Sequence, residues 1–500
     1  MLTDYPAAVD AARAGAVGRP RFTPPRETLL LAAVALGYGL AQIGSWRLDL
    51  GWDETIYVSQ VDPDVPTAFF SAPRARGVTL LAAPVASVTS DVTALRIWFT
   101  LLSAVALFCV FRLWFRVIAP AAAVVAGLLF ACLWVAVYYG PQVMPNLWVA
   151  FSAVAAVAGL LRVTAGSERH DLDRTGLLAL VLGAATMTLM RPSDAAWLSL
   201  PLVLGVLVVR SWRTWTAAAG LFGGLALGAL PWVVEAYVRF GGMLERLHQA
   251  SEIQGGTGFN PWLLRRTVQT LDGPLLCRPC APDPVSPLHV WWVFVLPVAV
   301  LVGVFVAVRH GRTGAALLPT LAAASIALPY LFLLEYTAPR FLLPSYALAA
   351  VPSGLAAHHL LVRAGRWRPV AIGVVAALLV VHVASQGAVL RNRVDAAARN
   401  GNGYTAVAER LHALGIDGDC VVSGYRAAPI AFYARCRSRM VGGHDGSIDA
   451  AGLVALSRRQ PTVVIVRGSR TPPPYAQSWA EHPLPRVGHT RLRAFVAPRS

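Results

Sequence analysis

Charged side chains are scarce in this sequence, and lysine is absent from it. Only 14 % of the 500 residues are charged, whereas 56 % are hydrophobic and the mean hydropathy is +0.56. Soluble proteins carry about 25 % charged residues, and a soluble chain of this size could not bury so much apolar surface. The same shortage of polar residues excludes a disordered chain, a collagen and a coiled coil. The composition therefore indicates a polytopic α-helical membrane protein.

Acidic residues are even scarcer than basic ones, so the net charge is strongly positive. The 43 basic residues are all Arg and face 26 Asp and Glu, which gives +17 and a pI of about 10.4. Such a balance often indicates a nucleic-acid partner. Arg in short cytosolic turns also orients membrane helices, and the turns expected on the cytosolic side all contain it. We therefore expect a lipid bilayer, and no nucleic acid, as the partner.

Apolar runs of spanning length follow one another along the chain, about eleven in number. They cover residues 28–46, 94–117, 119–138, 146–163, 175–190, 193–209, 216–234, 289–308, 315–334, 341–362 and 370–387. The Arg-containing tail at residues 1–27 has no cleavable signal and is expected to be disordered and cytosolic. An odd number of spans then places the C-terminus outside, in a multi-pass protein of the plasma membrane.

Three segments are too long to be turns and are predicted to lie outside the cytosol. Two are loops, at residues 47–93 and 235–288, of a transmembrane domain at 28–390, and the third is a separate α/β domain at 391–500. Residues 77–88 are apolar but too short to span, so we expect an interfacial helix there. The elements expected in the last segment are helices at 405–414, 429–434 and 450–458 and strands at 420–423 and 462–466.

Four of the six cysteines fall in the predicted external segments as two local pairs. Cys277 and Cys280 lie in the second loop, and Cys420 and Cys436 lie in the C-terminal domain. Pairs of this kind predict two disulfides, Cys277–Cys280 and Cys420–Cys436, in an oxidising compartment. A zinc site built from all four is the weaker alternative, because the pairs come from separate segments.

The most distinctive acidic residues are Asp53 and Glu54, directly after the first apolar run. Adjacent carboxylates can supply a general base and a neighbour that orients it. The alternative is simply an exposed, acidic start of a loop. Asp53, Glu54 and Tyr57 together form D-E-x-x-Y. In this place the pattern resembles the GT-C glycosyltransferases that use polyprenyl-phosphate sugars, such as protein O-mannosyltransferases and lipid A aminoarabinose transferases.

Further motifs in the same order strengthen this resemblance, which covers about residues 28–350. After the 77–88 helix come Asp91 and Arg96, and Tyr138–Asn146 is similar to the second external motif of the family. The other matches are Arg191-Pro192, Pro231-Trp232 with Tyr237, Phe240 and Gly241, and Pro339–Pro344. Asn146 stands where many relatives have an acid, and Tyr139 or Gly140 where some have His, so either a different acceptor or a loss of activity is expected.

The resemblance implies a transferase that moves a sugar from a polyprenyl-phosphate donor to an envelope glycan, glycolipid or protein. Arg340 and Arg191 are the candidates for binding the donor phosphate, since Arg contacts phosphate in a bidentate manner. Asp53 is the candidate base, oriented by Glu54, and a single displacement inverts the anomeric centre. No metal-binding motif is present in the sequence, so we expect a metal-independent reaction without a cofactor.

Seven further residues are candidates for substrate binding on the strength of the family motifs and their predicted depth. They are Tyr57, Asp91, Arg96, Tyr139, Asn146, Glu235 and Glu335. For Glu235 and Glu335, an ion pair with Arg340 is the alternative role. Two other functions stay open from the sequence. One is a non-enzymatic transporter of lipid-linked saccharides or an envelope scaffold, and the other is a lipid-linked oligosaccharide ligase or polymerase.

Overall fold

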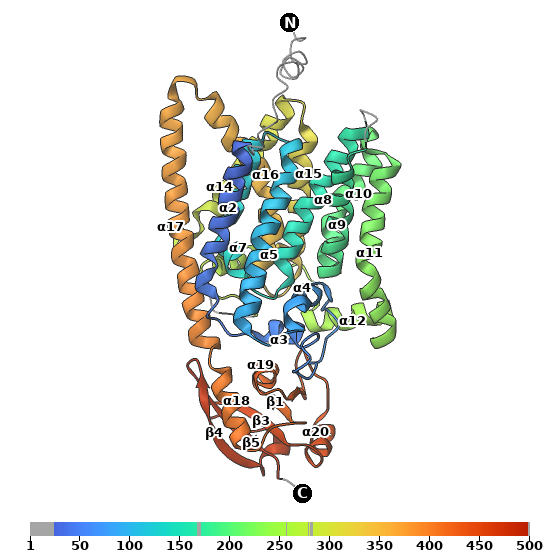
Figure 1. Cartoon of the computed structure of the whole chain (residues 1–500), viewed down its shortest axis with the longest axis vertical. Helices are drawn as coiled ribbons and strands as arrows, with labels where there is room; N and C mark the ends of the chain where they lie inside the picture. The colour runs from blue at the N-terminus through green and yellow to red at the C-terminus, as the bar shows by residue number, and fades with distance from the viewer. Residues whose placement is uncertain (1–24, 168–171, 257, 279, 281–283, 499–500) are drawn as a thin grey trace, which may run out of the picture.

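The computed structural model describes residues 25–498, except for 168–171, 257, 279 and 281–283. Most of the tail predicted at residues 1–27 lies outside the described residues. The chain forms a bundle of long helices with a smaller α/β domain at one end (Figure 1). Short helices of the two long loops, α3, α4 and α12, lie where the bundle meets this domain (Figure 1).

Helices form nearly all of the bundle, because a backbone in lipid must satisfy its hydrogen bonds internally. The first half of the bundle contains α2 (Arg26–Ala41), η2 (Ile43–Ser45), α3 (Trp52–Val58), α4 (Gly77–Ala86), α5 (Val92–Leu113), η3 (Trp114–Arg116), α6 (Pro120–Ala131), α7 (Trp134–Tyr139), α8 (Pro145–Ser167), α9 (Arg174–Met190) and α10 (Pro192–Val208). The second half contains η4 (Arg210–Trp212), α11 (Trp215–Arg239), α12 (Met243–Gln254), α13 (Trp262–Thr270), α14 (Pro287–Arg309), α15 (Thr313–Leu328), η5 (Pro329–Leu333), η6 (Pro339–Leu342), α16 (Leu343–Arg363), η7 (Gly365–Trp367) and α17 (Arg368–Gly401).

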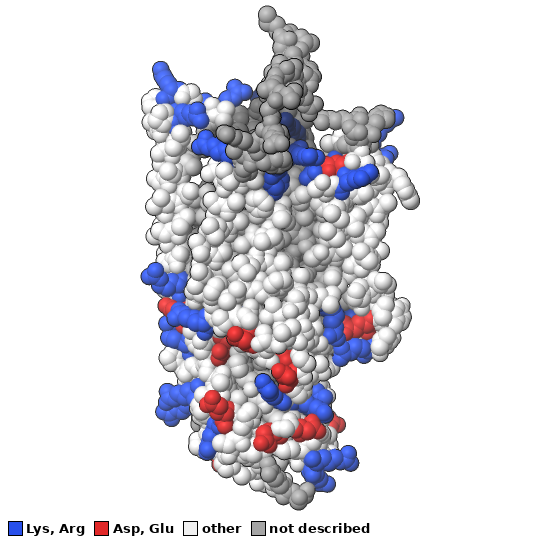
Figure 2. Space-filling model, viewed as in Figure 1, with Lys and Arg blue, Asp and Glu red and all other residues white. Residues whose placement is uncertain are grey.

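Seven helices in the described part of the chain are long and apolar enough to cross a membrane, and α4, α6, α9 and α10 are shorter apolar helices. Each of the eleven predicted runs contains a helix. On the face in Figure 2, charged side chains gather in belts at the two ends of the bundle, and the described surface between them is largely uncharged. This polytopic helical architecture agrees with the composition.

Three details of the helices differ from the sequence-based expectations. The run at 119–138 is two helices, α6 and α7, because Leu133 between them is extended, with ψ 125°. α15 ends in a π-helical turn, Pro329–Leu333. α17 continues to Gly401, past the domain boundary predicted at residue 390.

Glycines bring several helices into close contact, as is common in membrane bundles. A Cβ atom on Gly228 of α11 would lie 2.1 Å from the carbonyl oxygen of Ala185 in α9. A Cβ atom on Gly303 of α14 would lie 1.9 Å from the carbonyl oxygen of Pro352 in α16. Only glycine therefore permits these two approaches of one backbone to another.

The C-terminal domain is a five-stranded mixed sheet with helices on it. Its elements are α18 (Tyr404–Ala413), β1 (Val421–Gly424), α19 (Ala427–Tyr433), β2 (Arg437–Ser438), α20 (Ala450–Ser457), β3 (Thr462–Arg467), η8 (Pro474–Ala476), β4 (Ala480–Val487) and β5 (Thr490–Val496). The strand order is β2-β1-β3-β5-β4, with β1 parallel to β2 and β3, and β5 antiparallel to β3 and β4. Apolar clusters cover both faces of the sheet. The expected α/β alternation is present, and β2, β4 and β5 are additional.

We predict that Gly228→Ala destabilises the bundle, because its new methyl group would collide with the backbone of α9. Overpacking of this kind costs about 1–3 kcal/mol, and a lower thermal unfolding temperature in detergent would reveal it. Gly223→Ala on the same helix is the matched control, since no atom lies within 4 Å of its Cβ position. Equal unfolding temperatures for the two variants would contradict the predicted contact.

Candidate active site

A cavity of about 480 Å³ lies between the helical bundle and the C-terminal domain. Segments that are far apart in the sequence meet in its wall. They contribute Trp52, Asp53, Tyr57, Ser71, Pro73, Arg74, Met144, Pro145, Arg191, Ile253, Gln254, Leu276, Arg278, Tyr336, Arg340, Phe341, Met440, Gly442, Gly443, His444 and Asp445. Four predicted site residues, Asp53, Tyr57, Arg191 and Arg340, are thus brought together.

Asp53 lies in the first turn of α3 and reaches the cavity with 37 % of its side chain exposed. Its Oδ1 lies 2.9 Å from Arg74, and its Oδ2 lies 3.9 Å from Arg340. Burial alone raises the pKa of this carboxyl, but Arg74, Arg340 and Arg191 together lower the pKa below its ordinary value. Asp53 is therefore ionised at neutral pH and able to accept a proton.

Glu54 has a different environment from Asp53, because its side chain lies on the buried face of α3. It forms an ion pair with Arg96 of α5 and accepts hydrogen bonds from the amides of Gly51 and Val143, both at 2.9 Å. Arg96, 1 % exposed, also donates to the carbonyls of Leu48, Asp49 and Pro141. Glu54 and Arg96 therefore fix the start of α3 and with it the position of Asp53.

Arg340 enters the cavity from η6 with loosely bound donors. It donates to the hydroxyl of Tyr139 and to the carbonyl of Leu275, both at 3.5 Å. Its Nε is buried and has no hydrogen-bond partner among the described residues. Because both hydrogen bonds from its Nη1 are long, the guanidinium of Arg340 retains capacity for an anionic ligand.

Arg191 is the extended residue between α9 and α10, and Pro192 begins the second helix. It forms an ion pair of 2.8 Å with Asp194 and donates to the hydroxyl of Tyr330 at 3.0 Å. Tyr330 in turn donates to Asp194 at 2.5 Å, from the π-helical turn that follows α15. π-Helical turns are often found at functional sites, and this one closes the Arg191 triad.

Arg74, which the sequence analysis did not single out, connects the two domains at the cavity. Its guanidinium binds Asp53 and also Asp445 of the C-terminal domain. Asp445 is buried and accepts a further hydrogen bond of 2.6 Å from the indole of Trp52. Next to it, burial and the charge of Arg278 lower the pKa of His444, an effect that Asp445 opposes. The C-terminal domain therefore forms part of the site.

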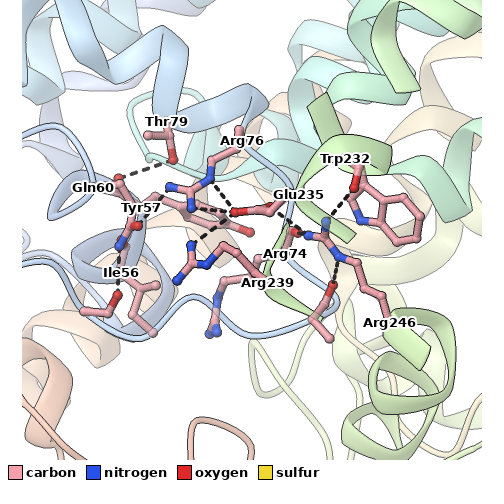
Figure 3. A network of polar contacts seen from close by, with 12 residues as sticks. Ile56, Tyr57, Gln60, Arg74, Arg76, Thr79, Trp232, Glu235, Arg239 and Arg246 are labelled. Carbon is pink, nitrogen blue, oxygen red and sulfur yellow. Dashed lines mark hydrogen bonds and ion pairs between the residues drawn. The ribbon is translucent and has the colours of Figure 1, made fainter. Parts of the chain in front are cut away.

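A cluster of arginines around Glu235 holds the loop that carries Arg74 (Figure 3). The carboxylate accepts from Arg76 at 2.6 Å, Arg246 at 3.0 Å and Arg239 at 3.2 Å. Arg246 is fully buried, and it also donates to the carbonyls of Ala72, Arg74 and Trp232. Its bonds to residues 72 and 74 fix the backbone on both sides of Pro73.

The proposed pairing of Glu235 and Glu335 with Arg340 is wrong. Glu235 pairs with Arg76, Arg239 and Arg246 instead, near the end of α11. Glu335 is exposed, with its carboxylate beside Gly255.

The remaining predicted binding residues lie outside the cavity wall. Asp91 is the N-cap of α5 and accepts from the amide of Thr93 at 2.8 Å. Tyr139 contacts the site through Arg340. Asn146 is fully buried at the start of α8, and its amide group has no partner among the described residues.

The structure contains both disulfides, Cys277–Cys280 and Cys420–Cys436. In the described part of the chain, no group of three or more His, Cys, Asp or Glu could hold a metal ion.

The arginines that sequence reasoning missed share one signal. Arg74, Arg76, Arg246 and Arg278 all lie in the segments predicted to be external. The positive-inside rule places Arg in the turns at the opposite end of the bundle. An Arg in a segment predicted to be external therefore indicates a local partner or ligand. Asp445 and His444 offer no such signal.

Similarity to known proteins was found at the level of structure. No protein-family model and no curated protein sequence matches the chain. Of the solved structures, ArnT from Cupriavidus metallidurans bound to undecaprenyl phosphate superposes with a TM-score of 0.65 and 14 % identity, covering 94 % of this chain and 98 % of that chain. The chain has the GT-C glycosyltransferase fold.

Two structures from Archaeoglobus fulgidus are similar as well. Its apo oligosaccharyltransferase has a TM-score of 0.55 and 12 % identity, with coverage of 90 % of this chain and 70 % of that chain. AglB in complex with an inhibitory peptide and a dolichol-phosphate has a TM-score of 0.50 and 12 % identity, covering 82 % and 64 %. The shared GT-C fold agrees with the resemblance that the sequence motifs indicate.

We predict that Arg246→Gln strongly destabilises the protein, because it leaves Glu235 and three carbonyls short of donors. Breaking a buried ion pair costs about 3–5 kcal/mol, which thermal unfolding in detergent would measure. Arg239→Gln is the control, since Arg239 is 41 % exposed and makes one bond to Glu235; an exposed pair contributes about 0–1 kcal/mol. A similar loss in both variants would refute the role of Arg246.

Proposed function

We propose that the protein is an integral-membrane glycosyltransferase that moves a sugar from a polyprenyl-phosphate donor to an extracytoplasmic acceptor. The observation that carries this proposal is an ionised Asp53 facing the loosely bonded Arg340 in one cavity. Glycosyl transfer from a phosphate requires a base for the acceptor and a group that binds the anionic phosphate, both facing the same cavity. The GT-C fold shared with ArnT, which binds undecaprenyl phosphate, supports the choice of donor.

The cationic residues of the cavity fit the charge of the leaving group. Arg74, Arg191, Arg278 and Arg340 face the cavity, and Arg74 is neutralised by its two carboxylates. A sugar bound through a phosphodiester carries one negative charge, and the released prenyl phosphate carries up to two. The guanidinium of Arg340 stabilises the charge that develops on the phosphate, with Arg191 as the second donor.

Asp53 acts as the base toward the acceptor hydroxyl or amine, and a single displacement inverts the anomeric centre. Its ion pair with Arg340 lowers its basicity while the site is empty. A donor phosphate that binds Arg340 weakens this pairing, so the pKa of Asp53 rises as the donor enters. Glu54 holds Asp53 in place through α3, and Trp52 and Tyr57 provide aromatic surface next to the sugar.

An apolar cavity in the bundle is suited to the prenyl chain. It has a volume of about 440 Å³ and lies between α6, α14, α16 and α17. Its wall consists of apolar side chains such as Leu129, Val295 and Leu379, with Tyr346 and His382 among the few polar ones. A flexible hydrocarbon chain gains free energy in such a groove.

We place the cavity and the C-terminal domain outside the cytosol of a plasma-membrane protein, with the N-terminus inside. The Arg-containing turns at the opposite end of the bundle support this orientation. An envelope glycan, glycolipid or protein then reaches the cavity as the acceptor. The reaction is proposed to need neither metal nor cofactor.

A lipid-linked oligosaccharide ligase is the second candidate, favoured by the similarity to the oligosaccharyltransferase of Archaeoglobus fulgidus. It would share Asp53 and Arg340 but use pyrophosphate-linked chains. Comparing the two donor classes in a reconstituted assay separates the candidates. Release of the lipid from neither class would instead favour a transporter or scaffold.

Asp53→Asn is predicted to abolish transfer, because an amide cannot accept the proton of the acceptor. General-base catalysis contributes about 10²–10⁴-fold to a rate, so release of prenyl phosphate in proteoliposomes should fall by at least this lower factor. Asp64→Asn, an exposed position in the same loop, should retain the wild-type rate. Full activity of the Asp53 variant would remove Asp53 from the reaction.

Arg340→Gln is predicted to weaken the use of the donor, because it removes a charged contact to the phosphate. A charge-assisted hydrogen bond is worth about 1.5–3 kcal/mol, so kcat/KM for the donor should fall by about 10–100-fold. Arg410→Gln, on the exposed face of α18, is the control for the loss of one positive charge. Unchanged donor kinetics in the Arg340 variant would exclude it from the phosphate site.

A further inference from the structure

The two disulfides of the protein have different surroundings. Cys420 and Cys436 are buried in the core of the C-terminal domain. Cys277 and Cys280 instead enclose Arg278, which lies in the wall of the active-site cavity. This second disulfide therefore constrains a segment that faces the substrate.

The segment around Cys277 is bound to the strand-like residues that lead to Arg340. The amide of Cys277 donates to the carbonyl of Thr337 at 2.9 Å, and the amide of Thr337 donates back to Cys277 at 3.2 Å. Two residues before Cys277, the carbonyl of Leu275 accepts from Arg340 itself at 3.5 Å. The hydroxyls of Thr267 and Thr337 add a contact of 3.0 Å. Residues 275–278 thus support the backbone and the side chain of the Arg340 segment.

Arg278 itself is held by contacts on two sides. Its guanidinium lies 4.4 Å from the ring centre of Tyr336 and donates to the carbonyl of Ile253, at the end of α12, at 2.7 Å. Behind it, Arg266 donates to the carbonyl of Cys280 at 2.5 Å. An unrestrained Arg side chain loses considerable rotamer entropy when it binds a ligand. Fixing the backbone of Arg278 before binding therefore lowers the entropic cost of binding.

We infer that the Cys277–Cys280 disulfide is a positioning element of the donor site, which holds Arg278 at the cavity and the Arg340 segment beside it. This inference rests on the proposed function, since it assigns both arginines to the anionic lipid phosphate. It also gives the disulfide a role different from that of Cys420–Cys436, which stabilises the core of a domain. The two disulfides therefore provide a matched comparison within one chain.

The test uses undecaprenyl phosphate as the probe and the full-length protein in detergent micelles, with affinity measured from the ligand-dependent shift of the unfolding temperature. Cys277→Ser with Cys280→Ser is expected to weaken binding about tenfold, the loss of one charge-assisted contact. Arg278→Gln should weaken it by a similar factor. Cys420→Ser with Cys436→Ser is the control for the loss of a disulfide and should bind like the wild type, because neither cysteine lies in the cavity wall.

Combining Arg278→Gln with the serine pair at 277 and 280 distinguishes positioning from general destabilisation. If the disulfide acts through Arg278, the combined variant binds little more weakly than the weaker of its two parents, because the effects are not additive. Unchanged binding in the serine pair would overturn the inference, and fully additive losses would overturn the part that concerns Arg278. A wild-type protein that does not bind undecaprenyl phosphate would count against the proposed function instead.

A second measurement does not depend on any ligand. Hydrogen exchange at the amide of Thr337 should become faster when Cys277 and Cys280 are serines, because its carbonyl partner is then less fixed. The same amide should be unaffected in the serine pair at 420 and 436. Unchanged protection of Thr337, or free thiols at Cys277 and Cys280 in the native protein by peptide mass spectrometry, would refute the positioning role.

Discussion

The arrangement of the site depends on the buried ion pair between Glu54 and Arg96. An ion pair inside a protein is tolerated only if its remaining donors and acceptors are also satisfied. Here that requirement draws in the carbonyls of residues 48, 49 and 141 and the amides of residues 51 and 143. The end of the first span, α3, α5 and the loop before α8 are thereby held together. Because Asp53 directly precedes Glu54 in the chain, this junction also fixes the position of Asp53.

The site depends on a second interaction as well, in which one guanidinium, that of Arg74, contacts both domains. Arg74 binds Asp53 from the bundle and Asp445 from the C-terminal domain, and Arg246 fixes the backbone that carries it. More polar contacts join the same surfaces, among them Asp49 with the amide of Gly403 and the amide of Leu50 with the hydroxyl of Tyr433. The C-terminal domain is therefore a structural part of the cavity rather than a separate cap. Changes at Asp445 therefore alter the electrostatics around Asp53 through Arg74.

Much of the fold could be predicted from the sequence, because lipid permits few alternatives to an apolar helix. The motif residues Asp53, Arg191 and Arg340 were also assigned to one side of the membrane, since they lie at the ends of spans there, and all three line the same cavity. Contacts such as Arg74 with Asp445 could not be predicted, because they join distant polar segments without a periodic pattern. The edge strand β4 was missed for a local reason: its sequence AEHPLPRV contains two prolines and charged residues, which an edge strand tolerates.

The long helix α17 extends from the bundle to the C-terminal domain, which forms part of the candidate active site. Its 34 residues extend over about 50 Å at 1.5 Å per residue, well beyond the thickness of about 30 Å of a hydrocarbon core. Directly after it, Asn402 accepts from the amide of Asp49 at 3.1 Å. Each residue of a helix adds about 100° of rotation. The length of α17 therefore sets how the C-terminal domain is rotated about the helix axis relative to the bundle. One residue added to or removed from α17 would turn Asn402 by about 100° about the helix axis, away from the amide of Asp49.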